Sequence, residues 1–347
     1  MSRLLLVSDA WHPQINGVVR TLERTLEELE TFGVACETLT PADYKTIPCP
    51  TYPEIRLALA TPWSVYGRLR DSGAELIHIA TEGPLGVLAR RWCVRNGVRF
   101  TTSYHTRFPE YVAARIPVPL DWTYAWMRYF HGAAAACMVA TPTLERDLAA
   151  RGFTNLVRWN RGVDHSLFNP DHRRVLDLPR PIFGYVGRVA IEKNLSAFLE
   201  LDLPGSKVVV GDGPAVADLQ RRFPDVVFTG AKVGRELAEH FTSLDVFVFP
   251  SLTDTFGNVV IEALASGVPV AAFPVMGPID VIGDSRTGVL DNDLRKAALA
   301  ALEIPRSRCR AYALGFSWEA SARNFLENML AAIGHELPDL PLRAAAE

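Results

Sequence analysis

Short apolar runs alternate with helix-period segments from one end of the chain to the other. Residues 3–8 and 182–186 are typical of buried strands. Residues 18–32 instead repeat their apolar side chains at the spacing of one helix face, and Gly33 follows as a cap. Strands that alternate with helices pack into a mostly parallel sheet with helices on both faces. The pattern therefore predicts an α/β protein.

The same alternation predicts the other elements. We expect strands at 55–60, 76–80, 98–103, 137–140, 207–210, 226–229, 245–249 and 268–273. A helix is expected over 84–96, with Pro84 in its first turn and Gly97 just past its end. A last helix is expected near 317–333.

The alternation stops once, at 169–181, where three prolines stand among charged residues. Because 347 residues are enough for two domains, we expect a boundary in this segment. The predicted parts are an N-terminal domain over 1–172, a C-terminal domain over 173–316, and a crossover helix with a tail over 317–347. Two doubly wound domains bind ligands where the carboxyl ends of their strands face a cleft.

Composition excludes several classes of protein. The net charge is −3, whereas a nucleic-acid binder carries a surplus of Lys and Arg. Five scattered cysteines without a C-x-x-C pair argue against a disulfide framework and a zinc site, and favour a reducing compartment. A signal peptide and an apolar run of about 18 residues are both absent from the sequence, so we expect a cytoplasmic protein. Asp291 and Asp293 form a D-x-D that we interpret as a turn and a helix cap, and we expect no metal site.

The strongest candidate segment follows the strand at 245–249. Asp254 precedes an expected helix start near Gly257, and Glu262 lies within that helix. The backbone N–H groups of Phe256, Gly257 and Asn258 would form an anion site supported by the helix dipole. For either acid alone, a helix cap or a solvated charge is the simpler explanation. Two acids that flank a glycine-opened helix favour a binding site.

A second candidate follows the strand at 182–186. Gly187 is followed by Arg188 and, after four intervening residues, by Lys193. Two cations at the carboxyl end of a strand suit a diphosphate. The alternative is a surface cluster of Arg, Glu and Lys that pairs within itself. Gly211, at another strand end, is expected either to flank a nucleotide base or to form only a turn.

Two weaker candidates lie in the N-terminal half. Asn16 and Gly17 open the helix over 18–32, where a glycine lets a phosphate approach the backbone; a tight turn is an equal alternative. Tyr104, His105 and Arg107 follow the strand at 98–103. A lone histidine is usually structural, but its position at a strand's carboxyl end makes a functional role about as probable.

Together these residues resemble the retaining glycosyltransferases of family 4, which have the GT-B fold. The resemblance covers nearly the whole chain. It implies two Rossmann-like domains that face each other across a cleft, with a C-terminal helix that begins near Trp318 and returns to the first domain. It also implies a nucleotide-diphosphate sugar as co-substrate, with no other cofactor.

The resemblance also assigns roles to residues. Arg188 and Lys193 would hold the diphosphate, Glu262 the ribose, and Asp254 with the backbone of 256–258 the donor sugar. His105 would face the reacting sugar. The implied catalytic set is His105, Asp254, Arg188 and Lys193. The implied donor site also includes Gly17, Gly211, Phe256, Gly257, Asn258 and Glu262. The implied acceptor side is Asn16, Glu82, Tyr104 and Arg107.

One departure concerns the acid at 254, where the family usually has Glu. The carboxylate is retained but is one methylene shorter, which bears on the choice of sugar. The segments 11–19, 81–86, 159–165 and 253–258 are similar to a subgroup that contains sulfolipid synthases, diacylglycerol glycosyltransferases and lipid mannosyltransferases.

We therefore expect a metal-independent, retaining, front-face transfer of a hexose or hexuronic acid from a UDP-sugar to diacylglycerol or a glycolipid. The alternative is a GDP-mannose-dependent α-mannosyltransferase on a lipid or polysaccharide. An alternative of another class is a sugar-nucleotide epimerase or a non-catalytic sugar-nucleotide-binding protein. A dehydrogenase is disfavoured because G-x-G-x-x-G is absent.

The acceptor leads to an expectation about location. The aromatic-rich stretch 116–130 is compatible with contact at the inner face of the cytoplasmic membrane. It is equally compatible with an ordinary helix that packs its aromatic side chains inward. The sequence leaves the oligomeric state open.

Overall fold

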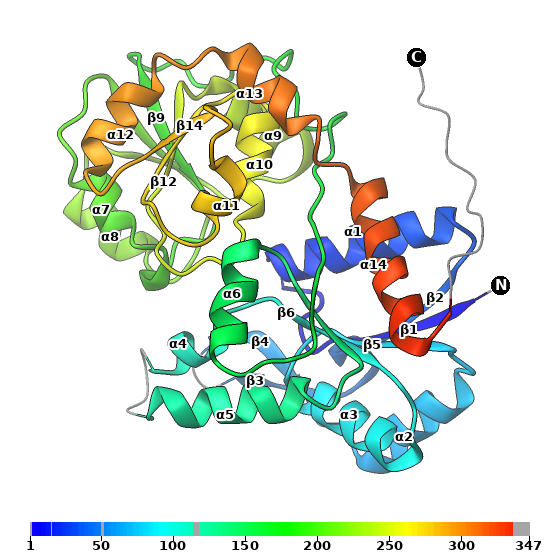
Figure 1. Ribbon diagram of the computed structural model, residues 1–347. Helices are drawn as coiled ribbons and strands as arrows, with labels where there is room; N and C mark the ends of the chain where they lie inside the picture. Colours follow the sequence, from blue (N-terminus) through cyan, green and yellow to red (C-terminus); the bar gives the residue numbers. More distant parts are fainter. Residues whose placement is uncertain (1, 15, 50–51, 114–117, 336–347) are drawn as a thin grey trace. The chain divides into compact units, whose positions relative to one another are not determined.

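The computed structural model describes residues 2–14, 16–49, 52–113 and 118–335 (Figure 1). The chain forms two compact units. The first unit is Met1–Asn160 with Trp318–Glu347, and the second unit is Arg161–Ser317. Each has its own six-stranded parallel sheet with helices packed on it, so the expected α/β class is confirmed.

The sheet of the first unit has the strand order β2-β1-β5-β6-β7-β8. Its strands are β1 (Arg3–Val7), β2 (Ala35–Leu39), β5 (Leu76–Ile79), β6 (Thr101–Tyr104), β7 (Ala136–Val139) and β8 (Leu156–Arg158). Its helices are α1 (Gly17–Thr31), α2 (Pro62–Asp71), α3 (Pro84–Asn96), α4 (Phe108–Ala113), α5 (Leu120–His131), α6 (Pro142–Ala150) and α14 (Trp318–Ile333), with a 3-10 turn at Pro41–Asp43.

β1 shows why this sheet has two covered faces. Leu4 and Leu6 belong to one buried cluster with residues of α1 and α14. Leu5 and Val7 belong to a second cluster with residues of α2, α3 and α5. Successive side chains of a strand point to opposite faces, so a strand buried on both faces is apolar throughout.

The expected strand at 55–60 lies outside the parallel sheet. β4 (Tyr52–Ala58) pairs antiparallel with β3 (Thr46–Cys49), and Thr46 is opposite Ala58. Arg56, in the middle of β4, donates from Nε to the hydroxyl of Thr46 at 3.0 Å. A charged residue is tolerated there because a hairpin leaves one face to solvent, whereas a strand inside a parallel sheet is buried on both.

The sheet of the second unit has the strand order β11-β10-β9-β12-β13-β14. Its strands are β9 (Ile182–Val186), β10 (Ser206–Val210), β11 (Val227–Gly230), β12 (Val246–Phe249), β13 (Val270–Ala272) and β14 (Gly288–Leu290). Its helices are α7 (Leu195–Leu199), α8 (Val216–Arg222), α9 (Gly234–Ser243), α10 (Asn258–Ala265), α11 (Pro278–Ile282), α12 (Leu294–Ala301) and α13 (Arg306–Ala313), with a 3-10 turn η2 at Ile191–Lys193.

The break between the units lies at residues 160 and 161, whereas the sequence places it at 172 and 173. The segment after the break is held by the second unit. Arg310 donates from Nη1 to the carbonyl of Phe168 at 2.7 Å, and the Phe168 ring lies 5.8 Å from the Phe241 ring. The backbone N–H of Val175 donates to Ser243 Oγ at 2.7 Å. The proline-rich segment is therefore packed against this unit.

α14 belongs to the first unit, although almost the whole second unit separates it from the rest in sequence. It packs against α1, as expected for a C-terminal helix that returns to the first domain. Phe325 is fully buried, with its ring 4.8 Å from the rings of both Trp159 and His78. The Asn328 amide donates to the carbonyl of Arg158 at 2.7 Å.

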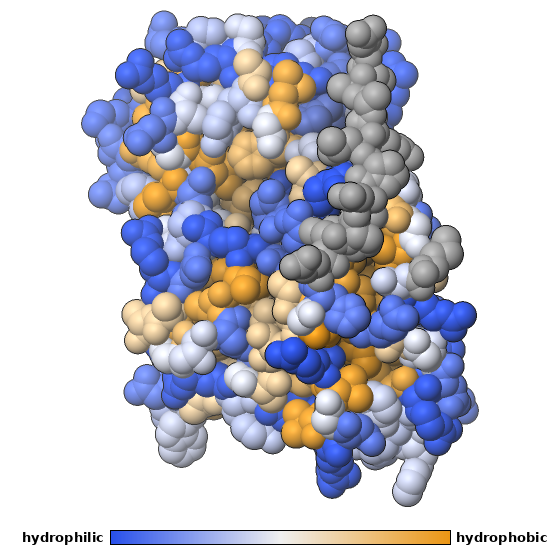
Figure 2. All heavy atoms as spheres, turned by 45° about the vertical axis from the view of Figure 1, so that its right-hand side comes forward, coloured by the Kyte–Doolittle hydropathy of each residue, from blue (hydrophilic) through white to orange (hydrophobic). Residues whose placement is uncertain are grey.

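No helix in the described ranges has the length and apolarity needed to cross a bilayer. On the face shown in Figure 2, hydrophobic residues are interspersed with hydrophilic ones.

Phe325→Ala tests whether α14 is part of the first unit's core. Removal of a fully buried phenylalanine is expected to lower the free energy of unfolding by about 3 to 5 kcal/mol, since it leaves a cavity beside Trp159. Ala331→Ser, at an exposed position of the same helix, is the control and is expected to change it by less than about 0.5 kcal/mol. Urea unfolding measures both, and equal effects would contradict the packing.

Candidate functional site

Two glycine turns are in close contact where β9 and β10 end. The N–H of Gly187 donates to the carbonyl of Val210 at 2.9 Å. A Cβ atom at Gly211 would lie 1.9 Å from the carbonyl oxygen of Gly187, and one at Gly213 would lie 2.3 Å from that of Val189. Only glycine permits so close a backbone approach. These turns fix the path of the chain on either side of Arg188.

Arg188 follows the first turn, and η2 then brings Lys193 toward the end of β12. Asn194 adopts a left-handed backbone conformation (φ 55°), and its side-chain amide donates to the carbonyl of Pro250 at 3.1 Å. The backbone carbonyl of Arg188 accepts a hydrogen bond from the hydroxyl of Tyr185 at 2.8 Å. The loop after β9 is thus fastened to the loop after β12.

Lys193 and Asp254 form an ion pair that joins the two strongest sequence motifs. Lys193 Nζ lies 2.6 Å from Asp254 Oδ1, and each side chain is 18% exposed. The cap of α10 is Gly257, so the interpretation of Asp254 as the helix cap is wrong. Lys193 pairs with an acid from the other motif, so a cluster paired only within its own motif is also excluded.

The loop after β12 carries three buried polar atoms that lack hydrogen-bond partners in the described part of the chain. They are Ser251 Oγ, Thr253 Oγ1 and Asp254 Oδ2. Ser251 is only 1% exposed. Buried oxygens of this kind are costly to leave unpaired and usually have a partner. Their position at the carboxyl end of a central strand makes this loop a candidate ligand site.

α10 begins directly after this loop. Its cap, Gly257, has φ +83°, and a glycine supplies no side chain to cap the first-turn N–H groups. The positive end of the helix dipole therefore carries no capping side chain from this residue, which suits the binding of an anion. Glu262, one turn into the helix, is 7% exposed. The interpretation of Glu262 as a solvated charge is therefore wrong.

In the first unit, the structure gives Asn16 a capping role. Its Oδ1 accepts from the N–H groups of Val18 and Val19, both at 3.0 Å, and Gly17 is the first residue of α1. Ser, Thr, Asp and Asn are favoured at this position for that reason.

The predicted residues after β6 lie in different environments. The ring of His105 is 5.7 Å from that of Trp159. Tyr104 is still within β6 and fully buried, so its ring has no surface that could reach an acceptor, and burial raises the pKa of its phenol. Arg107 pairs with Glu110 at 2.5 Å, and Glu110 also accepts from Tyr124 at 2.7 Å.

Glu82 is hydrogen-bonded to a fully buried histidine. Its Oε1 lies 3.0 Å from His131 Nε2, and His131 Nδ1 lies 3.0 Å from Thr102 Oγ1. Burial by itself lowers the pKa of His131, but interactions with Cys137 and with Glu82 outweigh it and raise the pKa to about 10. This contact links the loop after β5 to the end of α5.

Asp9 is a residue that the sequence analysis missed. It follows β1, and its carboxylate accepts from the N–H groups of Leu85 at 2.8 Å and Gly86 at 3.1 Å. Thr81 donates its hydroxyl to the same carboxylate at 3.1 Å. Asp9 thus fastens the first turn of α3 to the end of β1. An acid directly after a strand was the available signal, but its partners lie 72 to 77 positions away.

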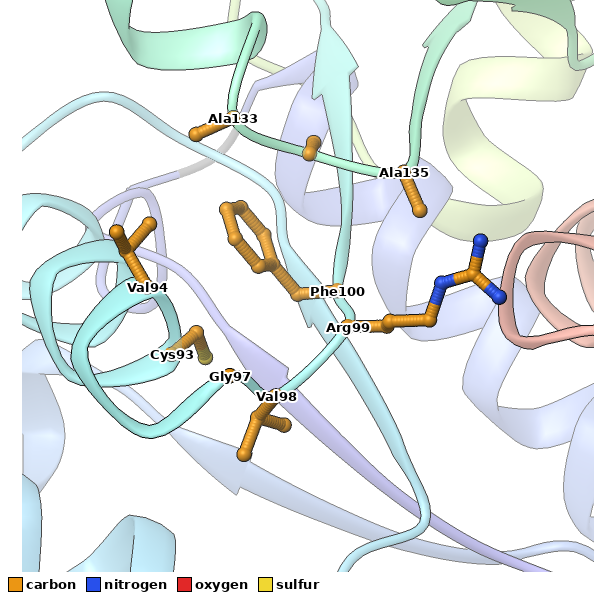
Figure 3. A pocket seen from close by; sticks show the side chains of 9 residues that line it. Cys93, Val94, Gly97, Val98, Arg99, Phe100, Ala133 and Ala135 are labelled. Atoms are coloured by element: carbon orange, nitrogen blue, oxygen red, sulfur yellow. The ribbon is translucent and has the colours of Figure 1, made fainter.

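A shallow pocket in the first unit is unrelated to these residues. It lies at the amino ends of β6 and β7 and is lined by Cys93, Val94, Val98, Phe100 and Ala133, among others. Figure 3 shows Phe100 pointing toward Val94 and Ala133. Open parallel sheets bind ligands at the carboxyl ends of their strands, which is the opposite edge.

The cap assigned to Asp293 is confirmed: its Oδ1 accepts from Lys296 N at 3.1 Å. Across the described ranges, no three His, Cys, Asp or Glu side chains gather as metal ligands would.

Two family descriptions match different parts of the chain, one in each half. Residues 15–167 match "Glycosyltransferase Family 4", and residues 180–304 match "Glycosyl transferases group 1". A GDP-mannose-dependent alpha-mannosyltransferase of Mycobacterium tuberculosis is 33% identical over 314 residues, which is 83% of this chain and 83% of that protein.

Other relatives have different activities. Sulfoquinovosyl transferase SQD2 of Arabidopsis thaliana is 32% identical over 70% of this chain and 51% of its own length. Alpha-monoglucosyldiacylglycerol synthase of Streptococcus pneumoniae is 25% identical over 93% and 83%. Among solved structures, sucrose-phosphate synthase of Thermosynechococcus elongatus superposes with a TM-score of 0.74 at 23% identity, covering 96% of this chain and 100% of that one.

The two parallel sheets and the returning helix define the GT-B fold, in agreement with that superposition. The chain belongs to glycosyltransferase family 4. It is a glycosyltransferase, and its donor is a nucleotide sugar.

Asp9→Asn tests the fastening of α3. Burial raises the pKa of Asp9 to about 6, against opposing hydrogen bonds from Leu85 and Gly86. A carboxyl whose pKa is higher in the folded than in the unfolded state stabilises the fold at low pH and loses that contribution as the pH rises through 6. The free energy of unfolding of the unmodified protein should therefore fall relative to Asp9→Asn by about 2 kcal/mol between pH 4 and pH 7. Denaturant unfolding across this range measures it, and a constant difference would contradict it.

Proposed function

We propose that the protein is a retaining α-mannosyltransferase that transfers mannose from GDP-mannose to a lipid acceptor. The pairing of Lys193 with Asp254 at the start of α10 carries the assignment of the donor site. The mannosyltransferase that is 33% identical over 83% of both chains supports GDP-mannose. That relative favours GDP-mannose over the UDP-sugar expected from the sequence.

The donor site supplies positive charge where the reaction develops negative charge. Cleavage of the bond between sugar C1 and the phosphate oxygen places charge on the leaving diphosphate. Arg188, Lys193 and the positive end of the α10 dipole would stabilise it. Lys193 would exchange its contact with Asp254 for one with the diphosphate. The carboxylate of Asp254 would then accept hydrogen bonds from hydroxyls of the donor sugar.

Glu262 suits the ribose. Its carboxylate lies one turn beyond the open start of α10 and is buried. A buried carboxylate needs hydrogen-bond donors, and the two hydroxyls of a ribose can supply them. This follows the role that the family resemblance implies for this position.

The stereochemical course follows from the family and from the absence of an assigned nucleophile. The acceptor hydroxyl would attack C1 from the face that the diphosphate leaves. One C–O bond to the acceptor forms, the C–O bond to phosphate breaks, and the hydroxyl proton passes to a phosphate oxygen. His105, which lies after β6 and is packed beside Trp159, is the residue of the first unit that we assign to the reacting sugar.

The lipid acceptor has support of a different kind. The Streptococcus pneumoniae relative is named for a glucosylated diacylglycerol. The mannosyltransferase relatives bear no acceptor in their names. Two observations support a lipid acceptor: this relative at 25% identity, and the resemblance of segments such as 253–258 to the subgroup of lipid glycosyltransferases.

A donor panel tests this function. The purified protein is incubated with GDP-mannose, UDP-glucose, UDP-galactose or UDP-glucuronic acid and a bacterial lipid extract, and the lipids are analysed by mass spectrometry. We expect a lipid that gains one hexose only with GDP-mannose. A product with a UDP-sugar alone would refute the donor assignment, and no lipid product with any donor would refute the acceptor. Conversion of the donor without transfer would instead indicate an epimerase.

Lys193→Ala and Glu262→Gln test the donor residues. Loss of one preorganised charged contact to the leaving group is expected to reduce kcat by about 100- to 1,000-fold for Lys193→Ala. Glu262→Gln should raise KM for the donor more than it lowers kcat, because the ribose is expected to be bound equally in the ground state and in the transition state.

The matched controls are Lys232→Ala and Glu239→Gln in the same unit. Lys232 pairs with Glu236 of α9, and Glu239 pairs with Arg235 of the same helix. Both should retain normal rates. Normal rates in Lys193→Ala or Glu262→Gln would overturn the site.

A further inference from the structure

α5 has an aromatic surface on the side that faces away from its own unit. Its buried residues are Tyr124, Met127, Phe130 and His131. Trp122, Trp126 and Tyr129 lie four and three positions apart and are 72%, 38% and 61% exposed. A helix that faces only water normally carries charged and polar residues on that side. Figure 1 shows α5 at the periphery of its unit.

Trp126 and Tyr129 are held in position by neighbouring side chains. The rings of Trp126 and Tyr129 are 5.7 Å apart, and the Arg90 guanidinium lies 4.0 Å from the centre of the Tyr129 ring. Arg90 is itself buried and donates from Nε to the carbonyl of Phe130 at 2.9 Å. This bond also joins α3 to α5. A fixed aromatic face loses little side-chain entropy when it is covered.

The helices beside α5 add positive charge. α2 packs against α3, and α2, α3 and α5 contribute to one buried cluster, so they form one layer on the sheet. The three helices contain six arginines, two aspartates and no lysine or glutamate. The exposed arginines are Arg68, Arg70, Arg91 and Arg95. Trp63, at the start of α2, is 84% exposed. The layer therefore combines exposed tryptophan with a net positive charge.

We propose that the outward face of α2, α3 and α5 docks onto the surface of an anionic lipid bilayer. The role of this docking surface rests on the proposed function, in which the acceptor is a lipid. Trp and Tyr insert at the depth of lipid headgroups, and arginines bind lipid phosphates. A second copy of the chain suits this face less well, because a two-fold contact would place the same arginines opposite one another.

The position of α5 relates this face to the acceptor side. α5 starts beside α4, where Tyr124 donates to Glu110 at 2.7 Å and Glu110 pairs with Arg107. Arg107 follows His105 at the carboxyl end of β6. Glu110 thus connects the N-terminal half of α5, through Tyr124, to the loop that carries His105, through Arg107. A bilayer on this face would bring lipid headgroups to the acceptor side of the first unit.

Vesicle binding tests the proposal with the full chain. Sedimentation is measured with vesicles of phosphatidylcholine alone and with vesicles that contain one third phosphatidylglycerol. The double variant Trp122→Ser/Trp126→Ser is compared with Val233→Ser/Leu314→Ser, which alters exposed apolar residues of the second unit. Thermal unfolding establishes that each variant is folded. No donor or acceptor substrate is present, so the outcome does not depend on the proposed reaction.

The protein should bind the anionic vesicles, and the tryptophan variant should bind them about tenfold or more weakly. The control should bind normally, and 0.5 M salt should weaken binding to the anionic vesicles because it screens the arginines. Equal binding by the tryptophan variant and the control would overturn the proposal, as would a dimer in sedimentation velocity that the tryptophan variant abolishes. If the donor panel gave no product but vesicle binding were as predicted, the proposed function would be refuted and the membrane-docking surface would be retained.

Discussion

The contact between Lys193 and Asp254 is the interaction on which the proposed site depends. It joins two loops that lie 61 positions apart, each at the carboxyl end of a buried strand. The loop that carries Lys193 follows the close contact of the turns at Gly187 and Gly211, and Asn194 holds it to the carbonyl of Pro250. A salt bridge with both partners largely shielded from water is costly to break by removing one partner. A diphosphate that replaces Asp254 as the partner of Lys193 meets that requirement without leaving the ammonium unpaired.

The residues around this contact suit the anion of the proposed donor site. The oxygens of Ser251 and Thr253 are buried without hydrogen-bond partners within the described structure, and the cap residue of α10 is a glycine, which supplies no capping side chain. In the first unit, hydrogen bonds fix the loops that follow the strands. Asp9 binds the start of α3, and His131 binds Glu82. Such loops place functional residues precisely while the sheet supplies rigidity.

Much of the architecture could be predicted from the sequence because buried parallel strands are apolar on both faces. This signal predicts the central strands β1, β5, β9 and β12, whereas the edge strands β2, β8 and β14 lack it. Asp254, Lys193 and Glu262 were predicted as site residues, but their contacts were not, since pairing across 61 positions leaves no local pattern. The family resemblance implies an acceptor-side role for Tyr104, and the sequence places this residue just after the expected strand at 98–103. In the structure β6 includes Tyr104 and buries it.

The central claim is that Lys193 is shared between Asp254 and the diphosphate. Calorimetric titration with GDP, which has the diphosphate but no sugar, tests it directly in Lys193→Ala and Asp254→Asn. The account predicts opposite effects: GDP should bind more weakly to Lys193→Ala and a few-fold more tightly to Asp254→Asn, where the competing carboxylate is neutral. Unchanged affinity in Lys193→Ala, or weaker binding of GDP to Asp254→Asn, would contradict it.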